Sequence, residues 1–192
     1  KYLACESSPD LHGIEVSALD MMKKIMRSAV ETGTPFIFFR DTTNRANPNK
    51  HAGMIYASNL CHEIAQNVGF TDLDEEIIQD DGSIVTRTKA GDMVTCNLNS
   101  INLGQTSDEE LEENIALQVR MLDNVITINQ FPVPETRVTS EKYRAIGLGT
   151  SGYHHYLVKH KVQWESDEHL TVADTLFENI AYAAIKASME LA

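Results

Sequence analysis

Apolar residues recur at intervals of three and four between Ser17 and Thr32, and Gly33 follows them. This spacing places the apolar side chains along one face of a helix, and glycine is the residue that most often ends one. The pattern therefore predicts an amphipathic helix over 17–32. Its buried stripe would consist of Leu19, Met22, Ile25, Met26, Ala29 and Val30.

The next segments alternate between apolar and turn-forming residues. The run 35–40, Pro-Phe-Ile-Phe-Phe-Arg, is typical of a short buried strand whose apolar side chains join the core. Residues 45–51 contain an Asn-Pro pair, which disfavours helix before the proline and predicts a turn. We expect residues 55–64 to be at least partly extended.

The middle of the chain combines strand and helix signals. An acidic stretch, residues 72–81, ends at Asp-Gly, and the β-branched run 84–88 follows it. Asp-Gly favours a hairpin turn, so we expect a solvated excursion with a small hairpin. Residues 93–104 alternate apolar and polar side chains and predict a strand. Ser107 and Glu110 have the spacing of a capping box, which predicts a long helix that ends before Pro132.

The C-terminal part predicts a strand over 143–148, a glycine-spaced turn at 147–152, and helices over 152–159 and 167–191. Strands that alternate with helices indicate an α/β fold. Residues 147–152 also match the GxGxxG pattern of dinucleotide sites. That motif requires a second strand with an acidic residue about 20 residues later, and helix is predicted there instead. A tight packing turn is therefore the preferred interpretation.

Composition and charge exclude several classes of function. With 28 acidic and 16 basic residues, the chain has a formal net charge of −12 and no basic run that could follow the phosphates of a polymeric nucleic acid. No stretch approaches the roughly 20 apolar residues of a membrane span. The three cysteines include no close pair, and the adjacent His154 and His155 lack the i, i+4 spacing of a shared metal ion. We therefore expect a soluble, cytoplasmic protein with no metal site.

The candidate chemistry lies in residues 58–63, Ser-Asn-Leu-Cys-His-Glu. In an extended strand or a finger-like loop, Asn59, Cys61 and Glu63 share one face, at a spacing of about 6.7 Å along the backbone. That face carries an amide, a thiol suited to nucleophilic or one-electron chemistry, and a carboxylate that can act as a general base. The alternative interpretation is a half-buried strand in which Cys61 is a small apolar filler.

Three separated motifs extend this interpretation. The first consists of residues 42–48 together with residues 59–64. The second is the run Cys96-Asn97-Leu98-Asn99-Ser100-Ile101-Asn102-Leu103-Gly104, and the third is residues 144–149. In this order they closely resemble the large catalytic chain of ribonucleotide reductases. The family's fold is a ten-stranded α/β barrel with the N-x-C-x-E cysteine at the tip of a loop inside it. The resemblance implies that residues 1–192 are a fragment of a single catalytic barrel domain, with Cys61 on a finger-type loop.

The resemblance also implies a radical mechanism. Cys61 would be the thiyl radical that takes the hydrogen from C3′ of a ribonucleotide, because S–H and ribose C–H bonds are close in strength. Glu63 would act as general base on the 3′-hydroxyl, and Asn59 would hold the ribose hydroxyls. Cys96 resembles one half of the redox pair that supplies the reducing electrons and is reset by an outside dithiol. We expect Cys61 and Cys96 to lie in one cleft without a disulfide between them.

Some parts of the family have no counterpart in the sequence. These are the second redox cysteine, the nucleotide-effector region, the later phosphate-binding loop and the tyrosines that relay the radical; Cys5 lies outside every matched motif. The chain opens on Lys1 and stops at Ala192 within a predicted helix. We therefore expect a fragment, from a split gene or an excised piece, that is catalytically incomplete without the remaining segments of the large subunit.

The implied partners follow from the same resemblance. They are a ribonucleotide substrate, a radical-generating small subunit and a thioredoxin- or glutaredoxin-like reductant. No cofactor would bind directly: a metal-bearing partner subunit would supply the radical, with adenosylcobalamin as the alternative. The competing hypothesis is a non-catalytic α/β assembly or interaction domain derived from the same fold.

Overall fold

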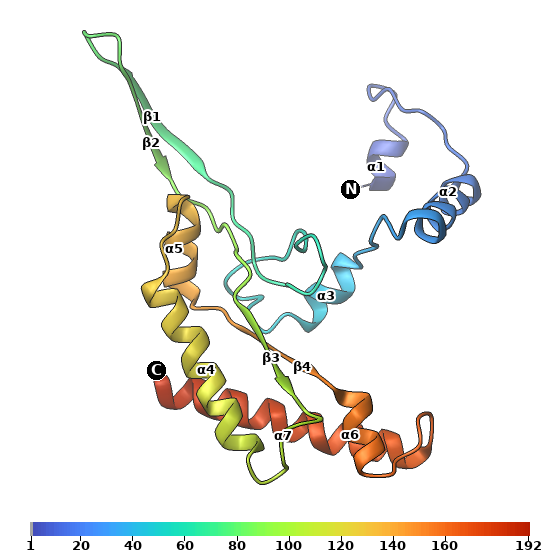
Figure 1. Ribbon diagram of the computed structural model, residues 1–192. Helices are drawn as coiled ribbons and strands as arrows, with labels where there is room; N and C mark the ends of the chain where they lie inside the picture. The colour runs from blue at the N-terminus through green and yellow to red at the C-terminus, as the bar shows by residue number, and fades with distance from the viewer. Residues whose placement is uncertain (1) are drawn as a thin grey trace. The chain divides into compact units, whose positions relative to one another are not determined.

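The computed structural model describes residues 2–192, which divide into two compact units between Phe39 and Arg40. The first unit holds α1 (Tyr2–Glu6) and α2 (Ala18–Thr32) (Figure 1). The elements of the second unit are α3 (Arg40–Ala46), β1 (Asp72–Ile78), β2 (Ile84–Lys89), β3 (Leu98–Asn102), α4 (Leu111–Ile128), α5 (Pro134–Tyr143), β4 (Gly147–Ser151), α6 (Tyr153–Lys159) and α7 (Asp167–Leu191).

Helix α2 confirms the predicted amphipathic helix. Ser17 caps it by accepting a hydrogen bond from the backbone N–H of Asp20 at 3.3 Å, and Gly33 (φ 77°) donates its N–H to the carbonyl of Ala29 at 2.9 Å. The predicted buried stripe is wrong for this unit: Ile25 and Ala29 are only half-buried, and the other four side chains are 52–85% exposed, namely Leu19, Met22, Met26 and Val30. An amphipathic helix buries its apolar face only where another element covers it. The stripe is therefore an apolar surface of the first unit.

The predicted strand at residues 35–40 is also wrong. Residues 35–39 have no regular secondary structure, and Arg40 begins α3. Phe36, Ile37 and Phe39 are 50–70% exposed. A strand forms only beside another strand that takes up its backbone hydrogen bonds, and within residues 2–192 the paired strands are β1 with β2 and β3 with β4. The turn predicted over 45–51 begins at residue 48, because Arg45 and Ala46 belong to α3.

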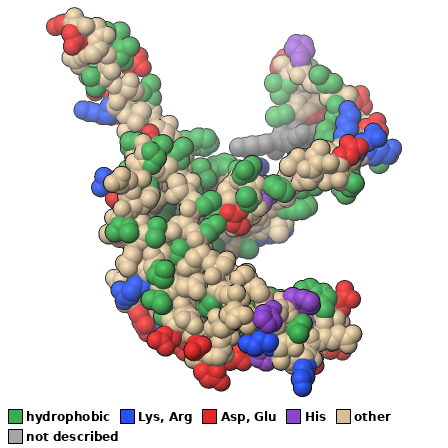
Figure 2. Space-filling model, viewed as in Figure 1, with side chains coloured by type: hydrophobic (Ala, Val, Ile, Leu, Met, Phe, Trp, Pro, Cys, Tyr) green, Lys and Arg blue, Asp and Glu red, His purple; other side chains and the backbone are tan. Residues whose placement is uncertain are grey.

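Strands β1 and β2 form the predicted hairpin. They pair antiparallel, with Ile78 opposite Ile84. At the turn, Asp81 Oδ1 accepts hydrogen bonds from the N–H and the hydroxyl of Ser83 at 2.9 and 2.7 Å, while Gly82 has a φ of 83°. Every residue of both strands is exposed, and Figure 2 shows apolar and acidic side chains together on this arm. The solvated excursion is therefore confirmed.

The core of the second unit lies where α4 and α7 pack with α6 against the strands β3 and β4 (Figure 1). Ile115 of α4 and Leu157 of α6 are both 0% exposed. The two strands pair in parallel, with Leu98 opposite Gly147. The strand predicted within residues 93–104 is thus confirmed for its central part, and parallel pairing agrees with the predicted α/β class.

Helix α4 begins later than the capping box predicts. Ser107 donates its hydroxyl and its N–H to Glu110 Oε2 at 3.0 and 3.5 Å, which is the returning half of such a box. The N–H of Glu110 bonds to the backbone carbonyl of Ser107 at 3.2 Å rather than to the side chain, and the helix starts at Leu111. It ends before Pro132, as predicted. Helix α5 has no counterpart among the predicted elements, because its sequence has no apolar periodicity.

The predicted packing role of the glycines in residues 147–152 is confirmed, but the predicted turn over this whole segment is wrong. Gly147 lies in β4, where an added Cβ would collide with Cδ2 of Leu98 in β3. Glycine therefore lets the two strands approach closely. Only Gly152, with a φ of 68°, turns the chain into α6. The strand expected over 143–148 is displaced, because Tyr143 is the last residue of α5.

Both C-terminal helices are confirmed. Helix α6 spans Tyr153–Lys159, and α7 spans Asp167–Leu191. Ser166 caps α7 by accepting a hydrogen bond from the N–H of His169 at 3.1 Å. No helix in the part of the chain that the structure describes is both long and apolar enough to cross a membrane.

Candidate active site

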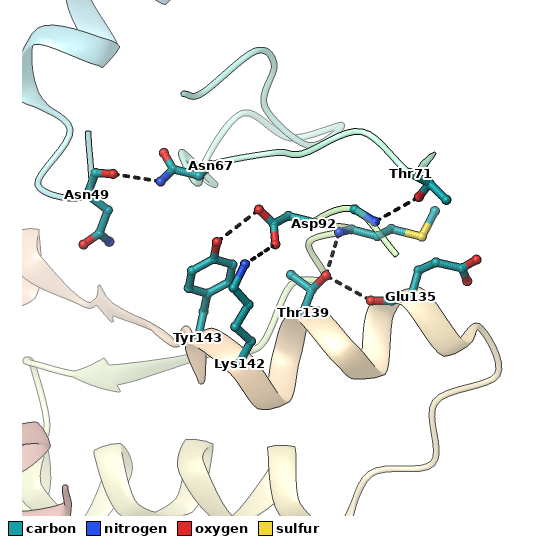
Figure 3. Close-up of polar contacts among 10 residues, drawn as sticks. Asn49, Asn67, Thr71, Asp92, Glu135, Thr139, Lys142 and Tyr143 are labelled. Atoms are coloured by element: carbon teal, nitrogen blue, oxygen red, sulfur yellow. Dashed lines mark hydrogen bonds and ion pairs between the residues drawn. The ribbon is translucent and has the colours of Figure 1, made fainter. Parts of the chain in front are cut away.

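Asparagine side chains fix the base of the loop that carries the candidate cysteine. The amide of Asn44 accepts from the N–H of Ile55 at 2.9 Å and donates to its carbonyl at 2.8 Å. Asn47 and Asn67 are buried and joined by a 2.8 Å hydrogen bond, and Asn67 also donates to the carbonyl of Asn49 at 2.9 Å (Figure 3). Buried amides with satisfied partners hold a single geometry, so the loop leaves and re-enters the fold at fixed points.

The tip of this loop is a tight turn. The N–H of His62 donates to the carbonyl of Asn59 at 3.2 Å, and His62 has a left-handed φ of 68°. The reversal brings Asn59 Nδ2 to 2.6 Å from Glu63 Oε1. In an extended strand these two side chains would lie about 13 Å apart, so the extended geometry is wrong and the finger-like loop is the form observed. Cys61 occupies the exposed third position of the turn.

Cys96 joins Asn59 and Glu63 in one cluster. Asn59 Nδ2 lies 3.4 Å from Cys96 Sγ, and Cys96 Sγ lies 3.8 Å from Glu63 Oε1. The carbonyl oxygen of the Asn59 side chain accepts from the N–H of Ile64 at 3.1 Å, which orients the amide group. A carboxylate and a thiol 33 residues apart in the sequence are therefore linked directly and through one shared amide.

A cavity of about 650 Å³ opens beside this cluster. Its walls include Ser58, Asn59, Asp92, Cys96 and Glu135, whereas Cys61 is not one of its lining residues. The expected cleft shared by both thiols is therefore not found in this cavity, because the turn places Cys61 elsewhere on the loop. Cys5, Cys61 and Cys96 are free thiols in this structure, and the separate roles expected for Cys61 and Cys96 stay a prediction.

The surroundings of Glu63 favour its ionised form. The hydrogen bond from Asn59 is the main cause that holds the pKa of Glu63 below its usual value. A backbone hydrogen bond, the Cys96 thiol and the nearby His62 act in the same direction. The structure thus presents an ionised carboxylate with a thiol and an amide donor beside it, and the ionised form is the one that a general base requires.

Replacing Asn59 with alanine is expected to raise the pKa of Glu63 toward the usual value of a glutamate, because the largest contribution to its lowering is then lost. The pKa of Glu63 is lower in the folded state than in the unfolded state. The contact therefore stabilises the fold fully at pH values above the unfolded-state pKa, and this stabilisation is lost as the pH falls through the folded-state pKa. An NMR pH titration of the Glu63 carboxyl measures the shift. Asp81 is the internal control, because its lowered pKa depends on Ser83 and should not change. An unchanged Glu63 pKa would contradict the assignment.

Three histidines of the C-terminal helices have packing partners. His154 and His169 lie against Trp164, with ring centroids 5.9 and 4.7 Å apart respectively. Across residues 2–192, no three His, Cys, Asp or Glu side chains gather closely enough to hold a metal ion. His160 stacks on Tyr156 at 4.1 Å and lies 3.5 Å from Asp108.

Comparisons with known proteins identify the family. The protein family described as "Ribonucleotide reductase, barrel domain" matches residues 1–192. The chain belongs to this family. The predicted fold class is thereby confirmed, and the parallel pair β3–β4 with its packed helices is consistent with part of an α/β barrel.

Members of the ribonucleotide reductase family align with the whole chain. It is 48% identical to the ribonucleoside-diphosphate reductase subunit alpha of Treponema pallidum and 36% identical to that of Helicobacter pylori, with 100% of this chain covered in both cases. The chain spans only 23% and 29% of the length of these relatives. A solved structure, the class Id ribonucleotide reductase alpha subunit of Actinobacillus ureae, shares the fold with a TM-score of 0.69 at 24% identity. That match covers 90% of this chain and 31% of the solved chain.

Sequence reasoning missed the residues that shape the site. Asn44, Asn47 and Asn67 hold the loop base, yet the sequence placed Asn44 and Asn47 only within a matched motif and a turn, without a role, and did not single out Asn67. The sequence placed Cys96 in the cleft of Cys61 but did not predict that its thiol contacts Glu63 directly. An excess of asparagine around an Asn-Pro pair is the one available signal, since asparagine side chains bond readily to nearby backbone.

Proposed function

We propose that this chain is the part of a ribonucleoside-diphosphate reductase catalytic subunit that carries the radical cysteine and one redox cysteine. Family membership supports the reaction class. The observation that carries the proposal is the contact of Asn59, Glu63 and Cys96 at the tip of the loop that presents Cys61. A base, an amide and a reducing thiol are together where such a reaction requires them.

Cys61, Glu63 and Asn59 act on the ribose. Cys61, as a thiyl radical, takes the hydrogen atom from C3′ and becomes a thiol, and later returns a hydrogen atom to that carbon. Glu63 accepts the proton of the 3′-hydroxyl, and its lowered pKa keeps the carboxylate ionised before that transfer. Asn59 now donates to Glu63 Oε1 and Cys96 Sγ, so it is placed to hydrogen-bond a ribose hydroxyl that enters between them.

Cys96 supplies reducing equivalents. The net reaction replaces the 2′-hydroxyl by hydrogen and releases water, while two thiols lose two electrons and two protons to form a disulfide. Cys96 is one of these thiols, and the second belongs to another segment of the catalytic subunit. A thioredoxin- or glutaredoxin-like dithiol then reduces the disulfide by thiol exchange.

The proposed assembly contains further partners. The remaining segments of the large subunit complete the barrel, and residues 1–192 form one piece of that single catalytic domain. A metal-bearing small subunit generates the radical that reaches Cys61, with adenosylcobalamin as the alternative source. The free state of all three cysteines is in keeping with a reducing cytoplasm, where dithiol carriers are available.

Reconstitution tests the proposal. The chain is combined with the segments that flank the matched region in the Treponema pallidum alpha subunit, with a radical-generating small subunit, a dithiol and a ribonucleoside diphosphate. We expect deoxyribonucleoside diphosphate in chromatographic assays. The matched control replaces this chain by the corresponding Treponema segment. An active control beside an inactive test mixture would contradict the proposal and favour a non-catalytic assembly domain.

A further inference from the structure

Residues 91–97 lead from the hairpin to β3 and are attached to α5 at their start (Figure 1). The Asp92 carboxylate accepts hydrogen bonds from Lys142 Nζ and from the Tyr143 hydroxyl, both at 3.0 Å, and its side chain is only 17% exposed (Figure 3). The N–H of Met93 donates to Thr139 Oγ1 at 2.7 Å. These contacts join consecutive residues of the segment to the last two turns of α5.

Both neighbours of Cys96 are also bonded to helices. Thr95 Oγ1 lies 3.2 Å from Ser140 Oγ on α5, and Asn97 Nδ2 donates to the carbonyl of Leu122 on α4 at 2.9 Å. The carbonyl of Asn97 accepts from the N–H of Gly147 at 2.9 Å, which starts the strand pairing. Cys96 lies between these two anchors, and its thiol contacts the loop tip.

The contact of the Cys96 thiol with the loop tip is too weak to fix the segment by itself. A thiol is a weak donor and a weak acceptor, so its contacts at 3.4 and 3.8 Å with Asn59 and Glu63 hold it only weakly. The flanking anchors use stronger donors and acceptors at 2.9–3.2 Å. The position of the thiol therefore depends on the anchors.

We propose that Thr95 and Asn97 are positioning residues that hold the Cys96 thiol against the Glu63 carboxylate. The inference rests on the proposed roles of Cys96 and Glu63. It adds that α4 and α5 set the distance between the reducing thiol and the base, although Cys96 and Glu63 lie in neither helix. Loss of the anchors lets the thiol move away from Glu63 while the loop tip keeps its own Asn59–Glu63 bond.

Thiol alkylation tests the inference without any reductase activity. Cys5 and Cys61 are replaced by serine in the intact protein, so that iodoacetamide reports on Cys96 alone. With the anchors present, Glu63→Gln is expected to raise the alkylation rate by about twofold or more, because a carboxylate 3.8 Å away disfavours negative charge on the attacking sulfur and residues in contact are coupled to this extent. With Thr95→Val and Asn97→Ala, the same Glu63→Gln change is expected to leave the rate unaltered.

Controls separate positioning from general destabilisation. Arg137→Ala removes an ion pair of α5 with Glu141 that does not reach residues 91–97, so it should leave the Glu63→Gln effect intact. Thr95→Ser keeps the hydroxyl and should preserve the effect. Circular dichroism shows whether Asn97→Ala unfolds the protein. If it does, Thr95→Val is used alone, because Thr95 is exposed, and it should still reduce the effect of Glu63→Gln on the alkylation rate. The inference would be overturned if Glu63→Gln changed the alkylation rate equally with and without the anchors. It would also be overturned if Glu63→Gln had no effect on that rate while the anchors were present.

Discussion

Replacing Cys61 with alanine is expected to abolish deoxyribonucleotide formation in the reconstituted reductase. Cys61 is exposed at the tip turn of its loop, and no methyl group can carry the radical that a sulfur atom carries. The loss should be about 10⁴-fold or more in kcat, comparable with the removal of a catalytic nucleophile from other enzymes. Product formation from a ribonucleoside diphosphate, measured with the small subunit and a dithiol in excess, gives the value.

Cys5→Ala is the matched control for this substitution. Cys5 is also an exposed free thiol, but it lies in the first unit and outside the matched motifs. We expect its replacement to leave kcat within about twofold, as for a surface position with no part in the reaction. Retained activity in the Cys61→Ala protein would show that the radical resides on another residue.

Replacing Ile115 with alanine is expected to lower the free energy of unfolding by about 2–5 kcal/mol. Ile115 is 0% exposed and belongs to the cluster in which α4 and α7 meet. The truncation removes buried methyl groups and leaves a cavity in a packed interior. Urea unfolding followed by circular dichroism measures the change in midpoint.

Leu117 provides the comparison within the same helix, because it is 55% exposed. Leu117→Ala is expected to change the free energy of unfolding by no more than about 0.5 kcal/mol. Equal effects of the two substitutions would mean that the α4–α7 contact is not the core of this unit.

Elements with local signals could be predicted from the sequence. Helix α2 has a capping serine and a terminal glycine, and the hairpin has an Asp-Gly turn, so each is specified within a few residues. The predicted strand at 35–40 failed because pairing depends on a neighbour, which a local pattern does not reveal. Helix α5 was missed because its residues have no apolar periodicity, although it anchors the segment before Cys96.

In the candidate site, too, the sequence predicted the residues but not their geometry. The sequence singled out Asn59, Cys61, Glu63 and Cys96, which the structure places on or beside one loop tip. Their spacing was predicted for an extended strand or a finger-like loop, and the loop form, with a turn at His62 in a left-handed conformation, decides it. The catalytic roles of these four residues stay predictions until the assays above are made.

The hairpin that separates the two cysteine motifs has a consequence for how related sequences can diverge. Its ends are tied together, since Thr71 Oγ1 accepts from the N–H of Gly91 at 3.1 Å, and its strands are exposed throughout. Doubling the length of such a loop costs only about 0.6 kcal/mol of closure entropy. Insertions and deletions there can accumulate in evolution while the thiol of Cys96 stays beside Glu63, so the number of residues between the two motifs is free to drift.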